Sequence, residues 1–218
     1  MSILSQSPTL PAPRVAQLRA ALEARFPGVV RALEPSEIES SQSSQTCLPP
    51  VVEPLSDNGV NTSPFHEGQI SEVVGRPGAG GCSIVLRSIA AALQSVNTLH
   101  KQINRYAVWI DLTGSLYPPA AATLGVPLKQ LLLIHPSDLQ QALQVVEIIL
   151  RGGSAHSIVL DIPQHTPPLR LGTYHRLRHR VRGTGCGLCI LTPHSIVPTP
   201  YRIELETRAS SIARLEIG

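Results

Sequence analysis

The chain has no apolar run of the roughly 18 residues that a membrane-spanning helix needs. Its two longest apolar segments, residues 131–134 and 145–150, are ended by His-Pro-Ser-Asp and Arg-Gly-Gly. The first residues also lack a charged segment followed by an apolar one, which is the pattern of a secretory signal peptide. These absences predict a cytoplasmic protein that makes no contact with membranes.

Cysteine and net charge are also low. The four cysteines, Cys47, Cys82, Cys186 and Cys189, do not have the spacing of a disulfide framework. The last two are compatible with a zinc or redox pair, but no second pair lies nearby, so we predict buried reduced thiols and no metal site. The formal net charge of +3 is too small by itself to indicate a nucleic-acid-binding protein.

A glycine-rich segment, residues 75–82, has the spacing of a phosphate-binding loop but lacks its reactive side chains. A short apolar strand precedes it and a helical pattern follows, which is the order in which such a loop holds nucleotide phosphates. Gly75 and Gly80 occupy the two glycine positions, whereas Gly81 replaces the lysine and Cys82 replaces the hydroxyl residue that binds Mg²⁺. The segment therefore predicts a nucleotide-binding fold that has lost hydrolysis and has no resident cofactor.

Residues 1–34 predict an N-terminal helical segment, with apolar residues at helical spacing interrupted at Pro27. We expect one helix there, either alone or with a short second one after it. The apolar stripe, which includes Leu18, Leu22 and Phe26, either docks on its own domain or packs on a neighbouring subunit or partner. The sequence leaves both possibilities open.

The rest of the chain divides into a linker and a core. Residues 35–64 are rich in Ser, Pro, Gln, Asn and Thr and predict a mobile linker. Residues 65–218 alternate strand and helix patterns, which predicts an α/β domain with a largely parallel, buried sheet. The predicted strands are 70–74, 106–111, 131–134, 157–161 and 187–191, and the predicted helices are 83–96, 118–124, 137–151 and 171–182. Residues 201–208 and 211–217 predict two antiparallel edge strands.

Four segments in order along this core resemble the RecA family. Besides the glycine loop, residues 108–126 are similar to the RecA stretch that carries Ile-Asp, Leu-Asp-Pro and Leu-Gly-Val. Residues 135–143 resemble the Gln-Pro-Asp and Glu-Gln-Ala-Leu segment that follows, and Ile158–Asp161 resembles the Walker B strand. Within the family the chain resembles the ImuA family, the inactive RecA-like proteins of bacterial mutagenesis cassettes, with the cell-division inhibitor SulA as a more distant relative. The resemblance implies a RecA-like, mostly parallel central β-sheet flanked by helices.

The departures from RecA lie where that family carries out its chemistry. The catalytic glutamate falls on Thr113, which has no carboxylate to act as a base. Thr192 and Pro193 replace the Asn-Gln pair that senses the γ-phosphate. Asp161 matches the Walker B aspartate, but without the lysine and hydroxyl we expect it to cap the strand end or the following turn. We expect Asp111 to be a polar residue at the sheet edge and the protein not to be an enzyme.

A basic segment occupies residues 170–182. If it is helical from Leu171, then Tyr174, Leu177 and Val181 face the sheet. The other side then presents four arginines, Arg176, Arg178, Arg180 and Arg182. They form either a solvated cationic helix or a surface that contacts DNA phosphates or an acidic partner.

The resemblance implies a catalytically inert accessory protein in SOS-type, damage-induced translesion DNA synthesis and mutagenesis. It implies RecA, the ImuB-type pseudo-polymerase and an error-prone C-family DNA polymerase as partners, DNA as a further candidate, and a cytoplasmic, nucleoid-associated location. Two alternatives stay open. One is a weak nucleotide-sensing P-loop ATPase that uses the loop amides and Arg76, and the other is a SulA-like inhibitor of cell division.

Overall fold

The computed structural model describes residues 14–31, 63–98, 106–153, 155–205 and 216–217. Its strands are β1 (Val30–Arg31), β2 (Ile70–Gly75), β3 (Tyr106–Asp111), β4 (Leu131–Ile134), β5 (Ala155–Asp161), β6 (Gly187–Thr192), β7 (Arg202–Leu205) and β8 (Glu216–Ile217). Its helices are α1 (Arg14–Arg25), α3 (Gly81–Thr98), α4 (Pro118–Thr123), α5 (Leu139–Gly152) and α6 (Leu171–Arg182), with a 3-10 turn, η2 (Leu128–Gln130). The strands and helices predicted between residues 70 and 192 are therefore confirmed, with ends that differ by at most two residues.

The strands form one eight-stranded sheet in the order β1-β4-β3-β5-β6-β2-β7-β8. The six strands from β4 to β7 run parallel, and β1 and β8 pair antiparallel at the two edges. The predicted RecA-like α/β class, with a mostly parallel sheet flanked by helices, is confirmed. None of the helices in the described ranges has the length and hydropathy of a membrane span.

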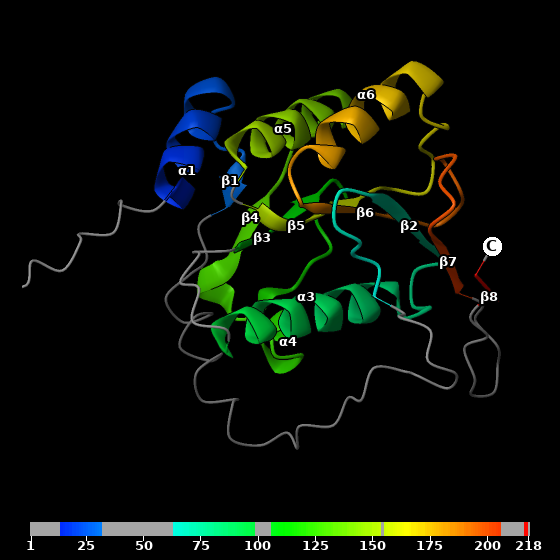
Figure 1. The fold of residues 1–218 in the computed structure, drawn as a ribbon, viewed down its shortest axis with the longest axis horizontal. Coiled ribbons are helices and arrows are strands. Elements are labelled where there is room, and N and C mark those ends of the chain that lie inside the picture. The colour runs from blue at the N-terminus through cyan, green and yellow to red at the C-terminus, as the bar shows by residue number, and fades with distance from the viewer. Residues whose placement is uncertain (1–13, 32–62, 99–105, 154, 206–215, 218) are drawn as a thin grey trace, which may run out of the picture.

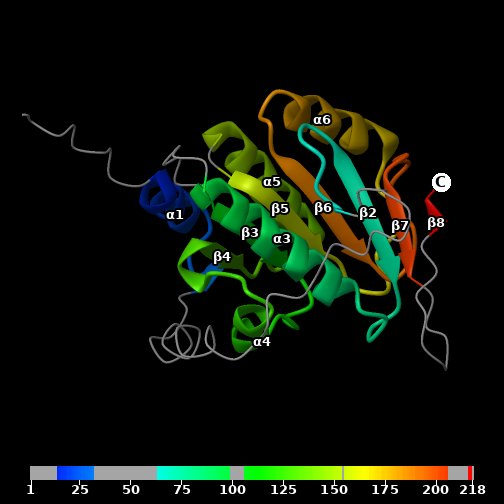
Figure 2. The same ribbon diagram turned by 60° about the horizontal axis from the view of Figure 1, so that its bottom comes forward.

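Helices cover both faces of the sheet. Figure 1 shows α1, α5 and α6 on one face and α3 and α4 on the other, and Figure 2 shows the same layers turned by 60°. Side chains of a strand alternate between the two layers. In β3, Val108 and Ile110 pack toward α5 and α6, and Ala107 and Trp109 pack toward α3. Because both faces are covered, the inner strands are largely apolar rather than alternating apolar and polar residues, and Glu72 of β2 and Ser157 of β5 are buried exceptions.

The N-terminal segment belongs to the same core as the rest of the sheet. Leu18 and Leu22 are buried in the cluster that α1 shares with α5, and Phe26 packs against that cluster. The structure thus decides between the two explanations of the apolar stripe in favour of docking on its own domain. Leu18, Leu22 and Phe26 are therefore not a free surface for a partner. Burial of each of the two leucines already stabilises this fold by about 1.5–3 kcal/mol, whereas Phe26 is partly buried.

The alternative with a short second N-terminal helix is wrong. After α1 the chain turns at Gly28, which has φ 76°. The carboxylate of Glu23 accepts hydrogen bonds from Gly28 N (2.9 Å) and Val30 N (3.1 Å), which fixes the turn. Residues Val30–Arg31 then pair with β4 as an edge strand. The predicted linker, residues 35–64, lies outside the described residues except for Ser63 and Pro64.

The C-terminal strands pair as predicted, but their surroundings differ. β7 and β8 are antiparallel, whereas β7 joins β2 in parallel. Because β6 and β7 run in the same direction on either side of β2, residues 193–201 must return along the sheet between them. This crossover contains no helix. It is extended chain that has to be held on the sheet by other means.

Candidate functional site

The candidate site lies at the carboxyl edge of the parallel strands. Asp111 ends β3 and Asp161 ends β5, and the two residues pair in register on adjacent strands. The chain after β3 leads to α4 on one face of the sheet, and the chain after β5 leads to α6 on the other. Such a reversal opens a crevice at the carboxyl edge, where α/β proteins bind ligands.

The glycine loop brings the N-terminal end of α3 to this edge. Gly78 and Gly80 have φ of 88° and 90°, conformations that glycine adopts without strain. The first amides of α3, at Gly81, Cys82 and Ser83, have no hydrogen-bond acceptor among the described residues. The backbone therefore keeps the form and polarity that favour an anion.

The lysine position of the loop is packed against apolar side chains. A Cβ atom added at Gly81 would lie 2.8 Å from Cδ1 of Leu191, and one added at Gly75 would lie 3.0 Å from Cβ of Leu205. The loop thus approaches β6 and β7 closely because it has no side chains there. A lysine at position 81 would require Leu191 to move.

The carboxylate of Asp111 makes its hydrogen bonds to the loop that follows β3. Its carboxylate accepts hydrogen bonds from the backbone N of Thr113 (2.9 Å), Gly114 (2.7 Å) and Leu116 (2.9 Å), and from Thr113 Oγ1 (2.7 Å). It folds the turn after β3, in agreement with the expected structural role at the sheet edge. Thr113, at the position of the catalytic glutamate, offers a hydroxyl that is already bonded to a carboxylate.

Asp161 is buried, with 5% of its surface exposed, and has few partners. Among the described residues, the one side-chain hydrogen bond of normal geometry to its carboxylate comes from Thr113 Oγ1, at 3.4 Å. Burial, and then the charge of Asp111, raise its pKa to about 7, although polar groups of Trp109, Thr113 and Ser115 lower it in part. The predicted cap is wrong, because no group of the following turn donates to this carboxylate in the described structure.

Cys82 lies at the same place. Burial, followed by the charges of Asp161 and Asp111, raises the pKa of its thiol to about 11, so the thiol stays protonated at neutral pH. The indole N–H of Trp109 is buried and lowers the pKa of Asp161, although among the described residues it forms no hydrogen bond of normal geometry. At the sensor position, Thr192 donates its hydroxyl to the carbonyl of His194 (2.8 Å).

The predicted burial of Cys186 and Cys189 is confirmed, and burial raises the pKa of each thiol to about 12. No group of three or more metal-ligating side chains occurs in the described part of the chain. Cys47 lies outside the described residues.

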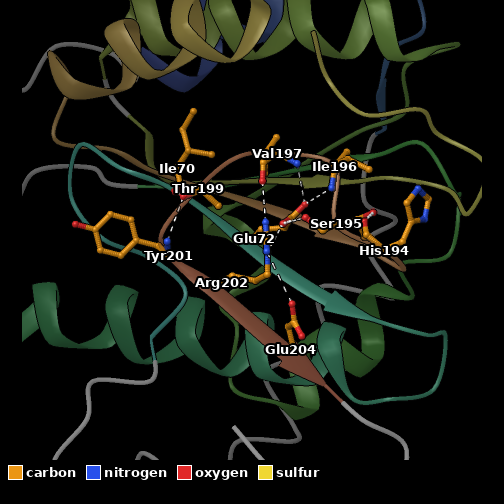
Figure 3. A network of polar contacts seen from close by, with 11 residues as sticks. Ile70, Glu72, His194, Ser195, Ile196, Val197, Thr199, Tyr201, Arg202 and Glu204 are labelled. Atoms are coloured by element: carbon orange, nitrogen blue, oxygen red, sulfur yellow. Dashed lines mark hydrogen bonds and ion pairs between the residues drawn. The ribbon is translucent and has the colours of Figure 1, made fainter. Parts of the chain in front are cut away.

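A third buried carboxylate, which the sequence reasoning missed, holds the crossover after β6. Glu72 of β2 is fully buried. Figure 3 shows its carboxylate facing the chain between β6 and β7. It accepts hydrogen bonds from Ile196 N (2.6 Å), Val197 N (3.2 Å), Ser195 Oγ (3.0 Å) and Arg202 Nε (2.8 Å). We call these five residues the Glu72 clamp.

The Glu72 clamp explains how an extended crossover stays on the sheet. Arg202 also donates to the carbonyl of Val197 (2.9 Å), and Thr199 Oγ1 donates to the carbonyl of Ile70 (2.6 Å). A single acidic residue inside the otherwise apolar strand β2 was the available signal, because a buried carboxylate requires charge-matched partners.

The basic helix folds as predicted, but its arginines are not equivalent. Tyr174, Leu177 and Val181 are buried against the sheet. Glu147 of α5 pairs with Arg176 Nε (2.9 Å) and Arg180 (3.6 Å). Arg178 and Arg182 have no ion-pair partner among the described residues.

Comparison with known proteins identifies the fold family. The model of the RecA N-terminal domain matches residues 54–168, slightly more than half of the chain. The chain belongs to the RecA N-terminal domain family. It is 33% identical to the RecA protein of Mycoplasmopsis pulmonis over 97 residues, which are 44% of this chain and 26% of that protein. It is 30% identical to the RecA protein of Brevibacillus brevis over 128 residues, which are 59% of this chain and 32% of that protein.

The chain therefore spans about a third or less of the length of these RecA relatives. Among solved structures, SulA from Pseudomonas aeruginosa is similar, with 22% identity and a TM-score of 0.43, over 56% of this chain and 97% of SulA. The RecA relationship is thus shown for the core that carries the glycine loop and β2 to β5.

The RecA family implies a bound nucleotide with Mg²⁺, and the residues of this edge do not fit that group. Gly81 supplies no ammonium, and Leu191 lies close to its place. The thiol of Cys82 is protonated and is a poor ligand for a hard cation. Asp111 is bonded to its own loop, and burial raises the pKa of Asp161 to about 7, which disfavours the ionised form that a cation requires.

Proposed function

We propose that this RecA-like protein is a catalytically inert accessory protein of damage-induced translesion DNA synthesis, of the ImuA type, and is not an enzyme. It acts by binding RecA, and its further partners are the ImuB-type pseudo-polymerase and an error-prone C-family DNA polymerase. The proposal places it in the cytoplasm, in association with the nucleoid.

One observation supports this proposal most strongly. The RecA fold is kept around a carboxyl edge where each group for phosphoryl transfer is replaced, at Gly81, Cys82 and Thr113. Positioning and neutralising the transferred phosphate is nearly all that a protein contributes to this reaction. A RecA fold that does not hydrolyse nucleotide can keep the surface through which it binds RecA. It then has no hydrolysis step that would release the bound RecA.

A nucleotide-sensing protein is the second candidate, because the α3 amides have no acceptor and Arg76 is exposed beside them. Isothermal titration calorimetry with ATP and Mg²⁺ separates the two candidates. The accessory protein gives no binding heat, whereas a nucleotide sensor gives saturable heat that is lost when Gly80→Ala disturbs the loop.

The experiment for the proposed function is a pull-down with the tagged full chain. RecA assembled on single-stranded DNA, the pseudo-polymerase and the filament-forming division protein are offered separately. Retention of RecA or the pseudo-polymerase, and not of the division protein, is the expected result. Retention of the division protein alone would replace the proposal with the SulA-like alternative.

A further inference from the structure

The positive charge of this protein is concentrated on one layer of the fold. Helices α1, α5 and α6 together carry eight arginines and two glutamates, a formal charge of +6. The whole chain is only +3, so the rest of the chain is formally −3. On the opposite face, α3 and α4 contribute one arginine and no acidic residue. The modest total charge therefore hides a strongly basic face.

Both acidic residues of this layer are already engaged inside the protein. Glu147 pairs with Arg176 and Arg180, and Glu23 accepts the two backbone amides of the turn after α1. Arg178 and Arg182 on α6 have no ion-pair partner among the described residues, and α6 has no acidic residue of its own. The helix dipole favours cations near the C-terminal end of a helix, and this accounts for the basic residues in the last turn of α6. The same explanation covers Arg25 and Arg151 in the last turns of α1 and α5, but it does not cover Arg19 of α1 or Arg176 and Arg178 of α6.

The residue types on this surface indicate which kind of anionic partner it fits: an acidic protein, a membrane surface or a nucleic acid. A protein interface requires a buried apolar or aromatic centre, and a membrane-surface helix requires an apolar face. Of the three large apolar side chains that are exposed in the described residues, Tyr117, Leu171 and Tyr201, only Leu171 lies on this layer. Its cations are all arginines, which bond phosphate through a two-pronged guanidinium.

We propose that the outer side of the α1, α5 and α6 layer binds the phosphodiester backbone of nucleic acid without sequence preference. The arginines contact phosphate oxygens. Tyr174, the one Tyr, Trp or Phe of these helices, is buried, and the exposed rings of the layer are those of His175 and His179. This goes beyond the proposed accessory role, because RecA could be bound without any contact to DNA.

The test measures fluorescence anisotropy of a short fluorescein-labelled oligonucleotide, as a single strand and as a duplex, with the full chain alone. The variant is Arg178→Ala with Arg182→Ala, which leaves the pairs of Glu147 intact. Loss of these two cations should weaken binding at least about tenfold at low salt. It should also reduce the slope of log K against log salt by about 1.4 for the single strand and 1.8 for the duplex.

The matched control removes two cations from the opposite face, Arg87→Ala with Lys129→Ala, both exposed. It should bind within about twofold of the parent, and thermal unfolding of both variants should match the parent. The proposal is overturned if the parent does not bind DNA at low salt, if the α6 variant binds like the parent, or if the control loses as much. Equal affinity for polyglutamate in competition would also overturn it, because the surface would not then select phosphate. Because RecA is offered on single-stranded DNA, the pull-down is repeated with the Arg178→Ala, Arg182→Ala variant. Retention of RecA by this variant does not depend on the proposed surface, so the failure of either proposal can be distinguished from the failure of the other.

Discussion

Two buried carboxylates of this protein, Glu72 and Asp161, have opposite environments. Glu72 receives two backbone amides, a hydroxyl and the guanidinium of Arg202. Asp161 receives one long contact from a hydroxyl that lies closer to Asp111, and its pKa rises to about 7. Glu72 lies in β2 and Asp161 in β5, with β6 between these two strands, and both side chains are at least nine-tenths buried.

The difference separates a buried charge that the fold has fully partnered from one that it has not. A buried charge is tolerated when the fold supplies its partners, and Glu72 has partners that hold the crossover in place. Asp161 has no cationic or backbone-amide partner of this kind, and the indole and hydroxyl groups near it offset only part of the effect of burial on its pKa.

The largest expected effect comes from removing the structural charge. Glu72→Ala should lower the free energy of unfolding by about 3–5 kcal/mol, because Arg202 and two amides lose their common acceptor. Urea denaturation monitored by circular dichroism measures the loss. A change below about 1 kcal/mol would show that the Glu72 clamp does not stabilise the fold.

Replacing each carboxylate by an amide of the same shape should change the free energy of unfolding in opposite directions at the two sites. Glu72→Gln should destabilise by about 1–3 kcal/mol, since its amide group faces donors. At pH 8, Asp161→Asn should instead stabilise, by on the order of 4 kcal/mol at most, as the penalty for ionising Asp161 disappears. Urea denaturation of both variants at pH 8 provides the comparison. Destabilisation by both substitutions would contradict the predicted difference in sign.

The stability of the parent should decrease as pH rises between about 4 and 7. The folded pKa of Asp161 is raised to about 7 from 3.8, so in this window the folded state holds a proton that the unfolded state has released. The stability is present below pH 4 and is lost by pH 7. Subtracting the pH profile of Asp161→Asn isolates this contribution, and an unchanged difference across the window would contradict the assignment.

A smaller effect is expected from giving Asp161 a partner. Asp161 and Leu191 pair in register, and Leu191 contacts the lysine position of the loop. Gly81→Lys together with Leu191→Ala should place an ammonium near Asp161 and lower its pKa by about one unit or more. The fluorescence of Trp109, the single tryptophan, reports the midpoint, with Leu191→Ala alone as control. An unchanged midpoint in the double variant would show that the ammonium does not reach Asp161.

Most of the core could be predicted from the sequence, because buried parallel strands are short apolar runs separated by helical patterns. β1 was missed, since two residues give no period and its position depends on pairing with β4. The partners of Glu72 and of Glu147 lie more than a hundred and about thirty residues away, so no local pattern indicates them. The cap expected at Asp161 was wrong for the same reason. The groups that surround its carboxylate, including Asp111, come from another strand, which no local pattern indicates.

The loss of catalytic groups could be predicted residue by residue, since the family spacing is kept from the glycine loop to Asp161. The sequence did not reveal that Leu191 packs against the lysine position or that Asp111 is committed to its own loop. Both facts arise from the parallel alignment of strands that are distant in the chain.

The most direct test of the central claim, a RecA fold without phosphoryl transfer, is a steady-state assay of phosphate release from ATP with Mg²⁺. The full chain is assayed with and without single-stranded DNA, beside an active RecA protein and the Asp161→Asn variant. We predict phosphate release at the background level, unchanged by the substitution or by DNA. Turnover near that of the active RecA protein, abolished by Asp161→Asn, would contradict the account.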